Sequence, residues 1–297
     1  MSWDLAGWLD GLICVQCDGA LQMAPKDGSS LHCSVCELVY PVEHGVLLLG
    51  TPDQRERLDR LARSYREARL QEGWRPLDGR MVRALPDVRP PGHPRLYWTT
   101  RSETFRAFVR RLPPSRDGAL AADLGAGTGW LSLCLAKRGY RAVAVEASRE
   151  PGFGLGALTD ALADAPLSVL PVQADLERPP LHPGRYALVV FNASLHYAHN
   201  CAATVARAAS LLRRGGILAV MDTPIAPKPR PGTGRGDRHL GRDELDSALR
   251  AAGLAVEWIP VRRGPLWWLH WLRAWRRGDP RFSFPLVLGR KEAEGLL

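Results

Sequence analysis

The second part of the chain shows a regular alternation of hydrophobic and polar positions. From about residue 100, apolar runs of strand length alternate with segments whose apolar residues follow a helical period. This alternation is typical of a parallel sheet that is covered by helices on both faces. The runs predicted as strands are 119–123, 141–146, 168–174, 186–192, 217–222, 255–261 and 282–288. Helices are expected between them, for example over 130–138 and over 202–213, with Gly215 and Gly216 as the stop of the second helix.

The first hundred residues have a different pattern. A cysteine-rich stretch comes first, and a charged stretch over 53–69 then carries Leu58, Leu61 and Tyr65 at helical spacing. We expect this helix to pack that apolar face on a neighbour. A chain of 297 residues with 45% hydrophobic residues can bury a sizeable core. The expected fold is α/β, with a seven-stranded, mostly parallel sheet, and the expected units are a small cysteine unit over 1–50, a helical connector over 51–98 and the main domain over 99–297.

The spacing of the first four cysteines predicts a metal site. Cys14 and Cys17 form one C-x-x-C pair, and Cys33 and Cys36 form a second pair after fifteen intervening residues. Two such pairs can meet in one tetrahedron, which is the geometry of structural zinc. Two disulfides are the alternative, and the absence of a secretory signal pattern at the N-terminus argues against them. Four sulfur ligands leave no open position, so the expected zinc ion is structural.

The cysteine stretch also carries a resemblance. Residues 12–50 resemble the zinc-ribbon family that includes the activator subunit of tRNA and protein methyltransferases, and the segment LVYPVEHGVLLLG is similar to the ending of that family. The resemblance implies a scaffold or a substrate-docking unit. It also implies that a protein partner can bind through this ribbon.

A glycine-rich turn follows the first strand of the main domain. Asp123 ends the strand, and Gly125, Gly127 and Gly129 follow at steps of two residues. Glycine lets the backbone turn tightly and approach a ligand. A dinucleotide fingerprint would have its third glycine where Trp130 stands, which argues against NAD and FAD. The turn instead resembles the first motif of class I, Rossmann-like methyltransferases, which implies S-adenosylmethionine as the cofactor.

Three later positions extend this resemblance. Glu146 ends the second strand, where an acid can accept both hydroxyls of a ribose. Asp175 follows the third strand, where the family has a residue that hydrogen-bonds the adenine amino group. Asn192 ends the fourth strand, at the sheet edge where ligands bind in open α/β folds.

The resemblance also assigns roles around the methionine part of the cofactor. It implies that Asp123 orients the glycine loop or meets the amino group, that Gly125 and Gly127 border the methionine moiety, and that Asn192 closes the site beneath it. Arg101 precedes the first strand. Its guanidinium could pair with the methionine carboxylate, or it could be a surface helix arginine.

The acceptor side is less defined. His196 lies just past the fourth strand and could take a proton from a hydroxyl acceptor near neutral pH, or it could simply pack at the strand end. The segment 225–242 is too rich in Pro, Gly and Arg for a helix or strand, and we expect a substrate lid, a phosphate-binding strap or a surface loop.

The segment PLWWLHWLRAWRR is the most unusual of the chain. Drawn as a helix, it has Trp267, Trp268, Trp271 and Trp275 in one arc and arginines on the other side. Such a face can line an aromatic acceptor pocket, make a peripheral membrane contact, or pack in the core.

Composition narrows the functional classes. The net charge of +9 and the pI of 9.6 invite a nucleic-acid interpretation, but the arginines are spread along the chain without one dense patch. No apolar run reaches the roughly 20 residues that span a bilayer. A cytoplasmic location is expected.

The predicted function is therefore methyl transfer from S-adenosylmethionine. A small apolar or aromatic acceptor is favoured. The first alternative is a methyltransferase of ribosomal or transfer RNA that uses the ribbon for docking, and the second is a non-catalytic partner subunit that binds the cofactor.

Overall fold

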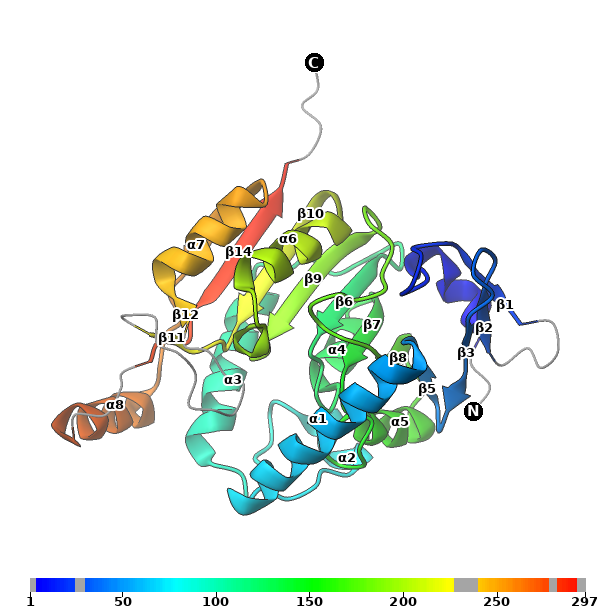
Figure 1. Ribbon diagram of the computed structural model, residues 1–297. Helices are drawn as coiled ribbons and strands as arrows, with labels where there is room; N and C mark the ends of the chain where they lie inside the picture. Colours follow the sequence, from blue (N-terminus) through cyan, green and yellow to red (C-terminus); the bar gives the residue numbers. More distant parts are fainter. Residues whose placement is uncertain (1–3, 25–29, 227–239, 278–281, 293–297) are drawn as a thin grey trace.

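The chain folds around one large twisted sheet. A computed structural model describes residues 4–24, 30–226, 240–277 and 282–292 (Figure 1). The strand order in the sheet is β13-β14-β10-β9-β6-β7-β8-β5-β4. In chain order the strands are β4 (Val42–Glu43), β5 (Val46–Leu48), β6 (Leu120–Leu124), β7 (Arg141–Glu146), β8 (Val169–Gln173), β9 (Tyr186–Asn192), β10 (Leu212–Met221), β13 (Leu254–Ile259) and β14 (Leu286–Lys291). The strands from β10 to β5 in this order run parallel, and β14 pairs antiparallel with both β10 and β13.

Seven of these strands are those that the sequence predicts, with small changes at their ends, so the expected fold class is confirmed. The last strand begins at Leu286 and not at residue 282. Strands β4 and β5 are additional and come from the chain that the sequence assigns to the cysteine unit. Leu47 and Leu48 of β5 pair in parallel with Val172 and Gln173 of β8. The first fifty residues therefore contribute directly to the main sheet.

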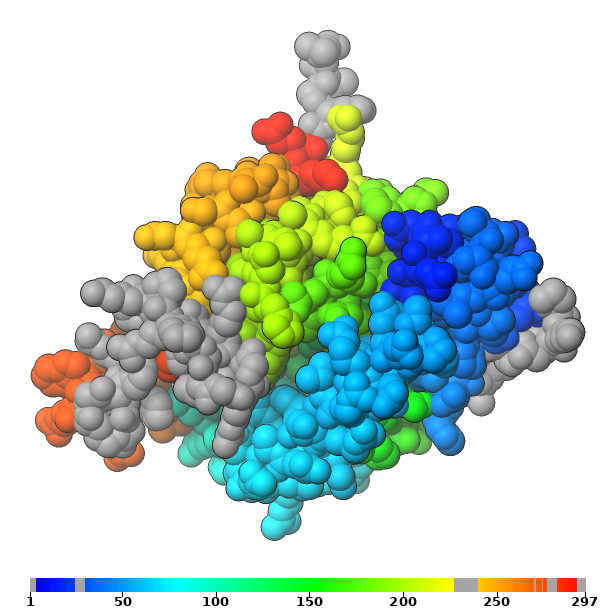
Figure 2. All heavy atoms as spheres, in the orientation of Figure 1, coloured from blue at the N-terminus to red at the C-terminus, as the bar shows by residue number. Residues whose placement is uncertain are grey.

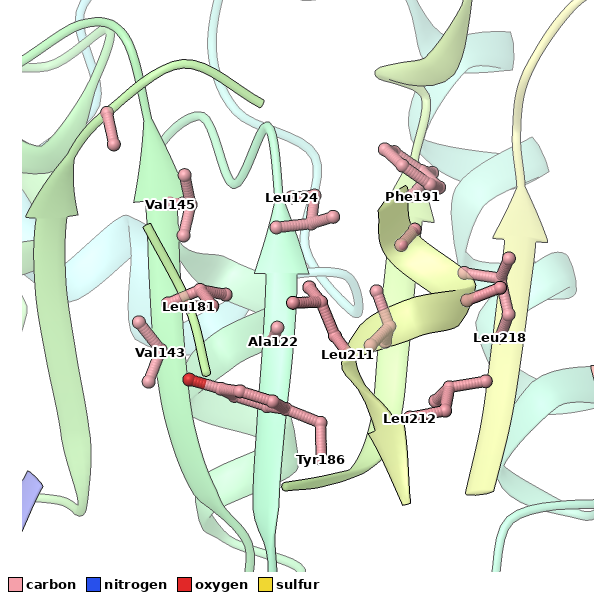
Figure 3. Close-up of a cluster of buried hydrophobic side chains, with 14 of the residues drawn as sticks. Ala122, Leu124, Val143, Val145, Leu181, Tyr186, Phe191, Leu211, Leu212 and Leu218 are labelled. Atoms are coloured by element: carbon pink, nitrogen blue, oxygen red, sulfur yellow. The ribbon is translucent and has the colours of Figure 1, made fainter. Parts of the chain in front are cut away.

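Helices cover both faces of the sheet (Figure 1). The helices in chain order are α1 (Pro52–Gln71), α2 (Gly79–Ala84), α3 (Arg95–Val109), α4 (Trp130–Ala136), α5 (Leu155–Asp164), α6 (Cys201–Leu211), α7 (Arg242–Ala251) and α8 (Pro265–Arg277), of which α8 projects from the body (Figure 1). Alternate residues of each central strand face opposite ways, so two apolar clusters form. Figure 3 shows one of them, where Ala122 and Leu124 of β6 lie beside Val143 and Val145 of β7.

Two local predictions are corrected. The helix expected over 202–213 ends at Leu211, and Gly215 and Gly216 lie inside β10. The pairing of β10 with β9 shifts register between Leu212 and Ile217, and Gly215 has a φ of +71°, so these glycines serve a bulge and not a helix stop.

The apolar face expected on the connector helix is also only partly buried. Leu58 is 2% exposed, but Leu61 is 53% exposed and Tyr65 37%. The buried stripe of α1 is formed by Leu58 and Ala62. The helix begins at a capping box between Thr51 and Gln54.

The ribbon lies at the end of the sheet where the central strands begin. It consists of the 3-10 helix η1 (Leu5–Gly11) and the strands β1 (Leu21–Met23), β2 (Leu31–Cys33) and β3 (Val39–Tyr40). Tyr186, the first residue of β9, donates a hydrogen bond to the carbonyl of Gly11 at 2.7 Å. Arg141, the first residue of β7, pairs with Asp10 at 3.2 Å. Apolar ribbon residues such as Leu12 and Tyr40 share one cluster with the sheet.

Candidate functional site

The glycine loop at the end of β6 is built around a buried carboxyl group. Asp123 is 0% exposed, and its Oδ2 accepts a hydrogen bond from the Ser132 hydroxyl at 2.8 Å. Its Oδ1 is buried without a hydrogen-bond partner. Burial raises the pKa of Asp123 to about 7. A buried oxygen of this kind is satisfied when a ligand supplies a donor, and an ammonium group fits this position.

The three glycines of the loop all have left-handed backbone conformations, with φ values of +76°, +56° and +75° for Gly125, Gly127 and Gly129. A Cβ on Gly125 would lie 2.4 Å from Cβ of Ser194, and one on Gly129 would lie 2.6 Å from Leu158. A Cβ on Gly127 would meet no atom within 4 Å. Packing therefore requires Gly125 and Gly129, whereas Gly127 borders open space in which a ligand can approach the backbone.

Glu146 at the end of β7 holds this loop in place. Its Oε2 accepts a hydrogen bond from the amide of Gly127 at 2.8 Å, and its Oε1 accepts one from the amide of Ser148 at 2.9 Å. Burial raises the pKa of Glu146. Each carboxylate oxygen keeps a free lone pair and can accept a hydroxyl, so this position fits the ribose of the cofactor.

Asp175, after β8, contacts α1. Its Oδ2 lies 2.5 Å from Nη2 of Arg57, and its Oδ1 accepts a hydrogen bond from the amide of Glu177. The ion pair is partly exposed, with side chains 47% and 29% accessible, so its contribution to stability is small. The predicted contact of Asp175 with adenine stays a prediction.

The ends of β9 and β10 bring further polar atoms to the same edge of the sheet. Asn192 is 8% exposed, and its Oδ1 has no hydrogen-bond partner. Asp222 directly follows β10 and is 4% exposed. Its Oδ1 accepts a hydrogen bond from the Thr104 hydroxyl at 2.7 Å, while its Oδ2 and the hydroxyl of Thr223 are buried without a partner. Burial raises the pKa of Asp222.

Sequence reasoning missed Asp222 as a site residue and treated it only as the end of a strand. A signal was present, because an acid at the carboxyl end of a parallel strand lies at the edge where ligands bind. Its partner Thr104, on α3, could not be found from the sequence.

The positive charge of Arg101, on α3, acts on both Asp123 and Asp222. Its guanidinium stacks on Tyr97 at 4.1 Å from the ring centroid and hydrogen-bonds the hydroxyl of Tyr97. Its positive charge partly offsets the rise in the pKa of both Asp123 and Asp222. The structure thus brings Arg101 near the predicted cofactor residues, and the carboxylate pairing stays a prediction.

Aromatic side chains from α1, the loop that follows it, α3 and the 3-10 helix η2 (Leu195–Tyr197) meet beside these polar groups. The Tyr65 and Tyr197 ring centroids are 6.3 Å apart, and those of Trp74 and Tyr97 are 4.8 Å apart. Arg69 joins the two pairs, because it donates a hydrogen bond to the Tyr197 hydroxyl at 3.0 Å and stacks on Trp74 at 5.0 Å. We call these four aromatic residues with Arg69 the aromatic wall.

His196, the predicted base, lies in η2 and is 9% exposed. Its ring stacks on Tyr197 at 4.2 Å between centroids. The histidine is therefore next to the aromatic wall, and its role as a base stays a prediction.

The four cysteines of the ribbon come together as predicted. All four sulfur atoms lie within 4.8 Å of one another, with 3.5 Å between Cys14 and Cys36 and 3.4 Å between Cys17 and Cys33. No disulfide joins the cysteines that the structure describes. Zinc–sulfur bonds of about 2.3 Å in a tetrahedron put the sulfur atoms roughly 3.8 Å apart. The donor set therefore fits a zinc ion.

The remaining predicted segments lie away from these groups. Ile225–Ala226 (β11) and Leu240–Gly241 (β12) form a short parallel pair, and residues 227–239 of the predicted lid or strap lie outside the described residues. Trp267 of α8 packs on Phe284, and Trp268 packs on Trp271, so the described ring contacts of α8 do not involve the aromatic wall. Among the described helices, none is long and apolar enough to cross a membrane.

Comparisons with known proteins bear on the domain type and the fold. Residues 122–220 match the family model of a methyltransferase domain. A search of curated protein sequences gave no significant match. Among solved structures, the YcgJ protein of Bacillus subtilis is 16% identical, with 65% of this chain and all of that chain covered and a TM-score of 0.52.

Geranyl diphosphate methyltransferase, solved with geranyl diphosphate and sinefungin, is 18% identical over 64% of this chain and 78% of that chain, with a TM-score of 0.53. The same enzyme with S-adenosylmethionine is 16% identical over 65% and 85% of the two chains, with a TM-score of 0.50. Likeness at this level of identity shows a shared fold, and the family match adds the domain type. Residues 122–220 therefore form a methyltransferase domain, and the chain shares its fold with methyltransferases that bind S-adenosylmethionine.

Proposed function

We propose that this enzyme methylates a small molecule that has an apolar or aromatic body and carries a hydroxyl or amine group. The proposal is carried by the aromatic wall together with the unpartnered buried oxygen atoms on Asn192 and Asp222. Arg101 links the two, because it hydrogen-bonds Tyr97 of the wall and its charge partly offsets the rise in the pKa of Asp222 that burial causes. Apolar walls with a few fixed polar atoms are typical of small-molecule sites.

The cofactor part of the proposal rests on three side chains. Asp123 holds the methionine amino group through its unpartnered Oδ1, Arg101 pairs with the methionine carboxylate, and Glu146 accepts the ribose hydroxyls. S-adenosylmethionine supplies an electrophilic methyl group on a positively charged sulfur. The residues then have to align the acceptor with that group and exclude water, which is a proximity effect.

The acceptor part rests on the end of β10. An acceptor hydroxyl or amine donates its hydrogen bond to Oδ2 of Asp222, whose other oxygen is fixed by Thr104. When oxygen or nitrogen receives the methyl group it gives up this proton. Asp222 is one candidate to take the proton, because burial raises its pKa, and His196 is the second.

The position of the ribbon favours this acceptor over RNA. The ribbon contacts Leu120, Arg141 and Tyr186, which are the first residues of β6, β7 and β9. The glycine loop and Asp222 lie at the opposite ends of the strands. RNA that is docked on the ribbon would be separated from the glycine loop and Asp222 by the length of the central strands. Electrophoretic mobility shift at physiological salt tests this point, and tight binding of ribosomal RNA would support the RNA alternative.

We also propose that zinc occupies the four-cysteine cluster as a structural ion. Metal analysis of the purified protein should give one zinc per chain. The variant Cys33→Ser should lower both the zinc content and the melting temperature. Full stability without zinc would contradict this role.

Calorimetric titration with S-adenosylmethionine is the first experiment, followed by a methyl-transfer screen with labelled cofactor and a panel of hydrophobic phenols, amines and ribosomal RNA. Asp222→Asn should cut turnover of the acceptor at least tenfold while cofactor affinity is unchanged. The matched control is Asp246→Asn, on α7, which should change neither the turnover of the acceptor nor the cofactor affinity. Cofactor binding without any product, together with copurification of a stable partner, would favour the non-catalytic subunit.

A further inference from the structure

Helix α8 exposes an apolar face to solvent. Five large apolar side chains on it are between 39% and 59% exposed, and they are Leu266, Trp268, Leu269, Leu272 and Trp275. The predicted tryptophan arc is divided, because Trp267 and Trp271 are partly buried while Trp268 and Trp275 are the most exposed of the five. A helix of a water-soluble domain usually turns such a face toward the core. The exposed face of α8 therefore suits a surface outside this chain.

The start of α8 is firmly attached. Arg263 has a side chain only 6% exposed, and its Nη1 donates to the carbonyl of Thr100 at 2.9 Å and pairs with Glu103 at 3.4 Å. Glu103 also accepts the amide of Gly264 at 2.9 Å. Trp267 packs on Phe284 with 5.6 Å between ring centroids. The helix is thus fixed at its first turn on α3, and the rest projects from the body (Figure 1).

Helix α8 itself carries arginines and no acidic residue. From Trp258 to Gly278 the sequence holds five arginines and no acidic residue. Arg262, Arg273 and Arg276 are exposed. At about 100° per residue, Arg273 and Arg276 fall on the same side of the helix as Leu269 and Leu272. Both arginines therefore lie among the exposed leucines, where their guanidinium groups can reach phosphate groups while their stems cover apolar surface.

We propose that α8 docks the enzyme on an anionic phospholipid surface. Exposed tryptophan and leucine insert at the boundary of headgroups and acyl chains, and the arginines meet lipid phosphates. A second copy of the chain fits less well, because each copy has a net charge of +9 and would bring the same arginines to the contact. Figure 2 shows α8, in orange, and the ribbon, in blue, on opposite sides of the molecule, so this contact leaves the ribbon free.

This inference deepens the proposed function in one respect, because an apolar acceptor partitions into a bilayer and would be collected there. Binding to lipid itself does not depend on methyl transfer. A failed acceptor screen with intact vesicle binding would therefore count against the proposed function and leave the docking surface in place.

The experiment is co-sedimentation of the full chain with vesicles of phosphatidylcholine alone and of phosphatidylcholine mixed with phosphatidylglycerol. We expect at least tenfold tighter binding to the anionic vesicles, and weakening at high salt. The double variant Trp268→Ala/Trp275→Ala and the double variant Arg273→Glu/Arg276→Glu should each weaken binding at least tenfold. Leu61→Ala, which removes an exposed leucine of α1, and Arg110→Glu/Arg116→Glu, which makes the same charge change elsewhere, are the matched controls.

Thermal melting of every variant shows whether it is folded. Equal binding to both kinds of vesicle, no binding to either, or equal losses in the control variants would overturn the proposal. Light scattering without lipid tests the competing occupant, since a dimer that Trp268→Ala/Trp275→Ala disperses would assign this face to a second copy.

Discussion

At the scale of single residues, the candidate site contains two buried carboxyl groups, and each has one oxygen atom without a hydrogen-bond partner. Asp123 and Asp222 each have one oxygen bound by a hydroxyl, from Ser132 and Thr104 respectively, and one oxygen without a partner. Burial raises the pKa of both acids. Protein groups thus fix the direction of each carboxyl, and each carboxyl keeps one oxygen atom that can accept a further hydrogen bond.

If Asp123 has its proposed role, its raised pKa predicts that cofactor binding depends on pH. When the pH is below the pKa of about 7, the Asp123 carboxyl is protonated. When the pH is above it, the ionised carboxylate attracts the methionine ammonium group. Affinity for S-adenosylmethionine should therefore rise roughly fivefold or more between about pH 6 and about pH 7.5. Calorimetry at several pH values measures this rise. Asp123→Asn should bind more weakly and lose the rise, and an unchanged pH dependence in this variant would assign it to another group.

The same pKa has a consequence for stability without cofactor. In the unfolded chain Asp123 ionises above its ordinary pKa of 3.8, whereas in the folded protein it keeps its proton up to about 7. The free energy of unfolding contributed by this group therefore falls as the pH rises through that interval. Asp123→Asn should flatten this part of the stability profile.

Gly125 and Gly127 should respond differently to the same substitution. Gly125→Ala places a Cβ 2.4 Å from Ser194 and should lower the melting temperature strongly. Gly127→Ala meets only open space, so it should lose stability by only about 1 kcal/mol, from its left-handed backbone, while cofactor affinity drops at least tenfold. Gly184→Ala has a similar φ of +73° and open space away from the site, and it calibrates the backbone effect. Normal cofactor binding by Gly127→Ala would show that no ligand approaches there.

At the scale of elements, β5 and α1 connect the ribbon to the site. Strand β5 runs parallel to β8, and α1 follows directly along the edge where the parallel strands end. Arg57 in the first half of α1 contacts Asp175, and Arg69 near its end contacts Tyr197. Helix α1 thus spans from the residue predicted to bind adenine to the aromatic wall.

The start of α1 should be sensitive to its cap. The Thr51 hydroxyl accepts a hydrogen bond from the amide of Gln54, and the Gln54 side chain accepts one from the amide of Thr51. Thr51→Ala should lower the free energy of unfolding by about 1 kcal/mol, as measured by urea denaturation. Thr99→Ala is the control, because the Thr99 hydroxyl bonds only a carbonyl of its own helix. Equal effects of the two changes would mean that the cap has no special contribution.

At the scale of the whole molecule, the ribbon and the sheet share one core. Leu5, Leu12 and Tyr40 lie in the same apolar cluster as Val143 and Phe191 of the central strands. The described residues of the ribbon are therefore not packed as a separate unit, because their apolar side chains share the core of the sheet and the strands that follow them, β4 and β5, belong to the sheet.

Shared packing predicts a single unfolding transition. Removal of zinc by a chelator should lower the melting temperature of the whole protein, with near-ultraviolet circular dichroism and tryptophan fluorescence changing together. Two separate transitions, with the ribbon melting first, would show that the two parts are energetically independent.

The sequence alone determined the features that depend on residues close together in the chain. Alternation of apolar runs identified the seven strands, the glycine spacing identified the loop after Asp123, and the cysteine pairs identified the cluster, because strand period, backbone freedom and ligand spacing are local properties. The tertiary structure decided what depends on distant segments meeting: the pairing of β5 with β8, the ribbon at the beginning of the central strands, the contact of Thr104 with Asp222, and the exposed face of α8. These follow from the burial of surface by elements far apart in sequence, and no local pattern records which surfaces will meet.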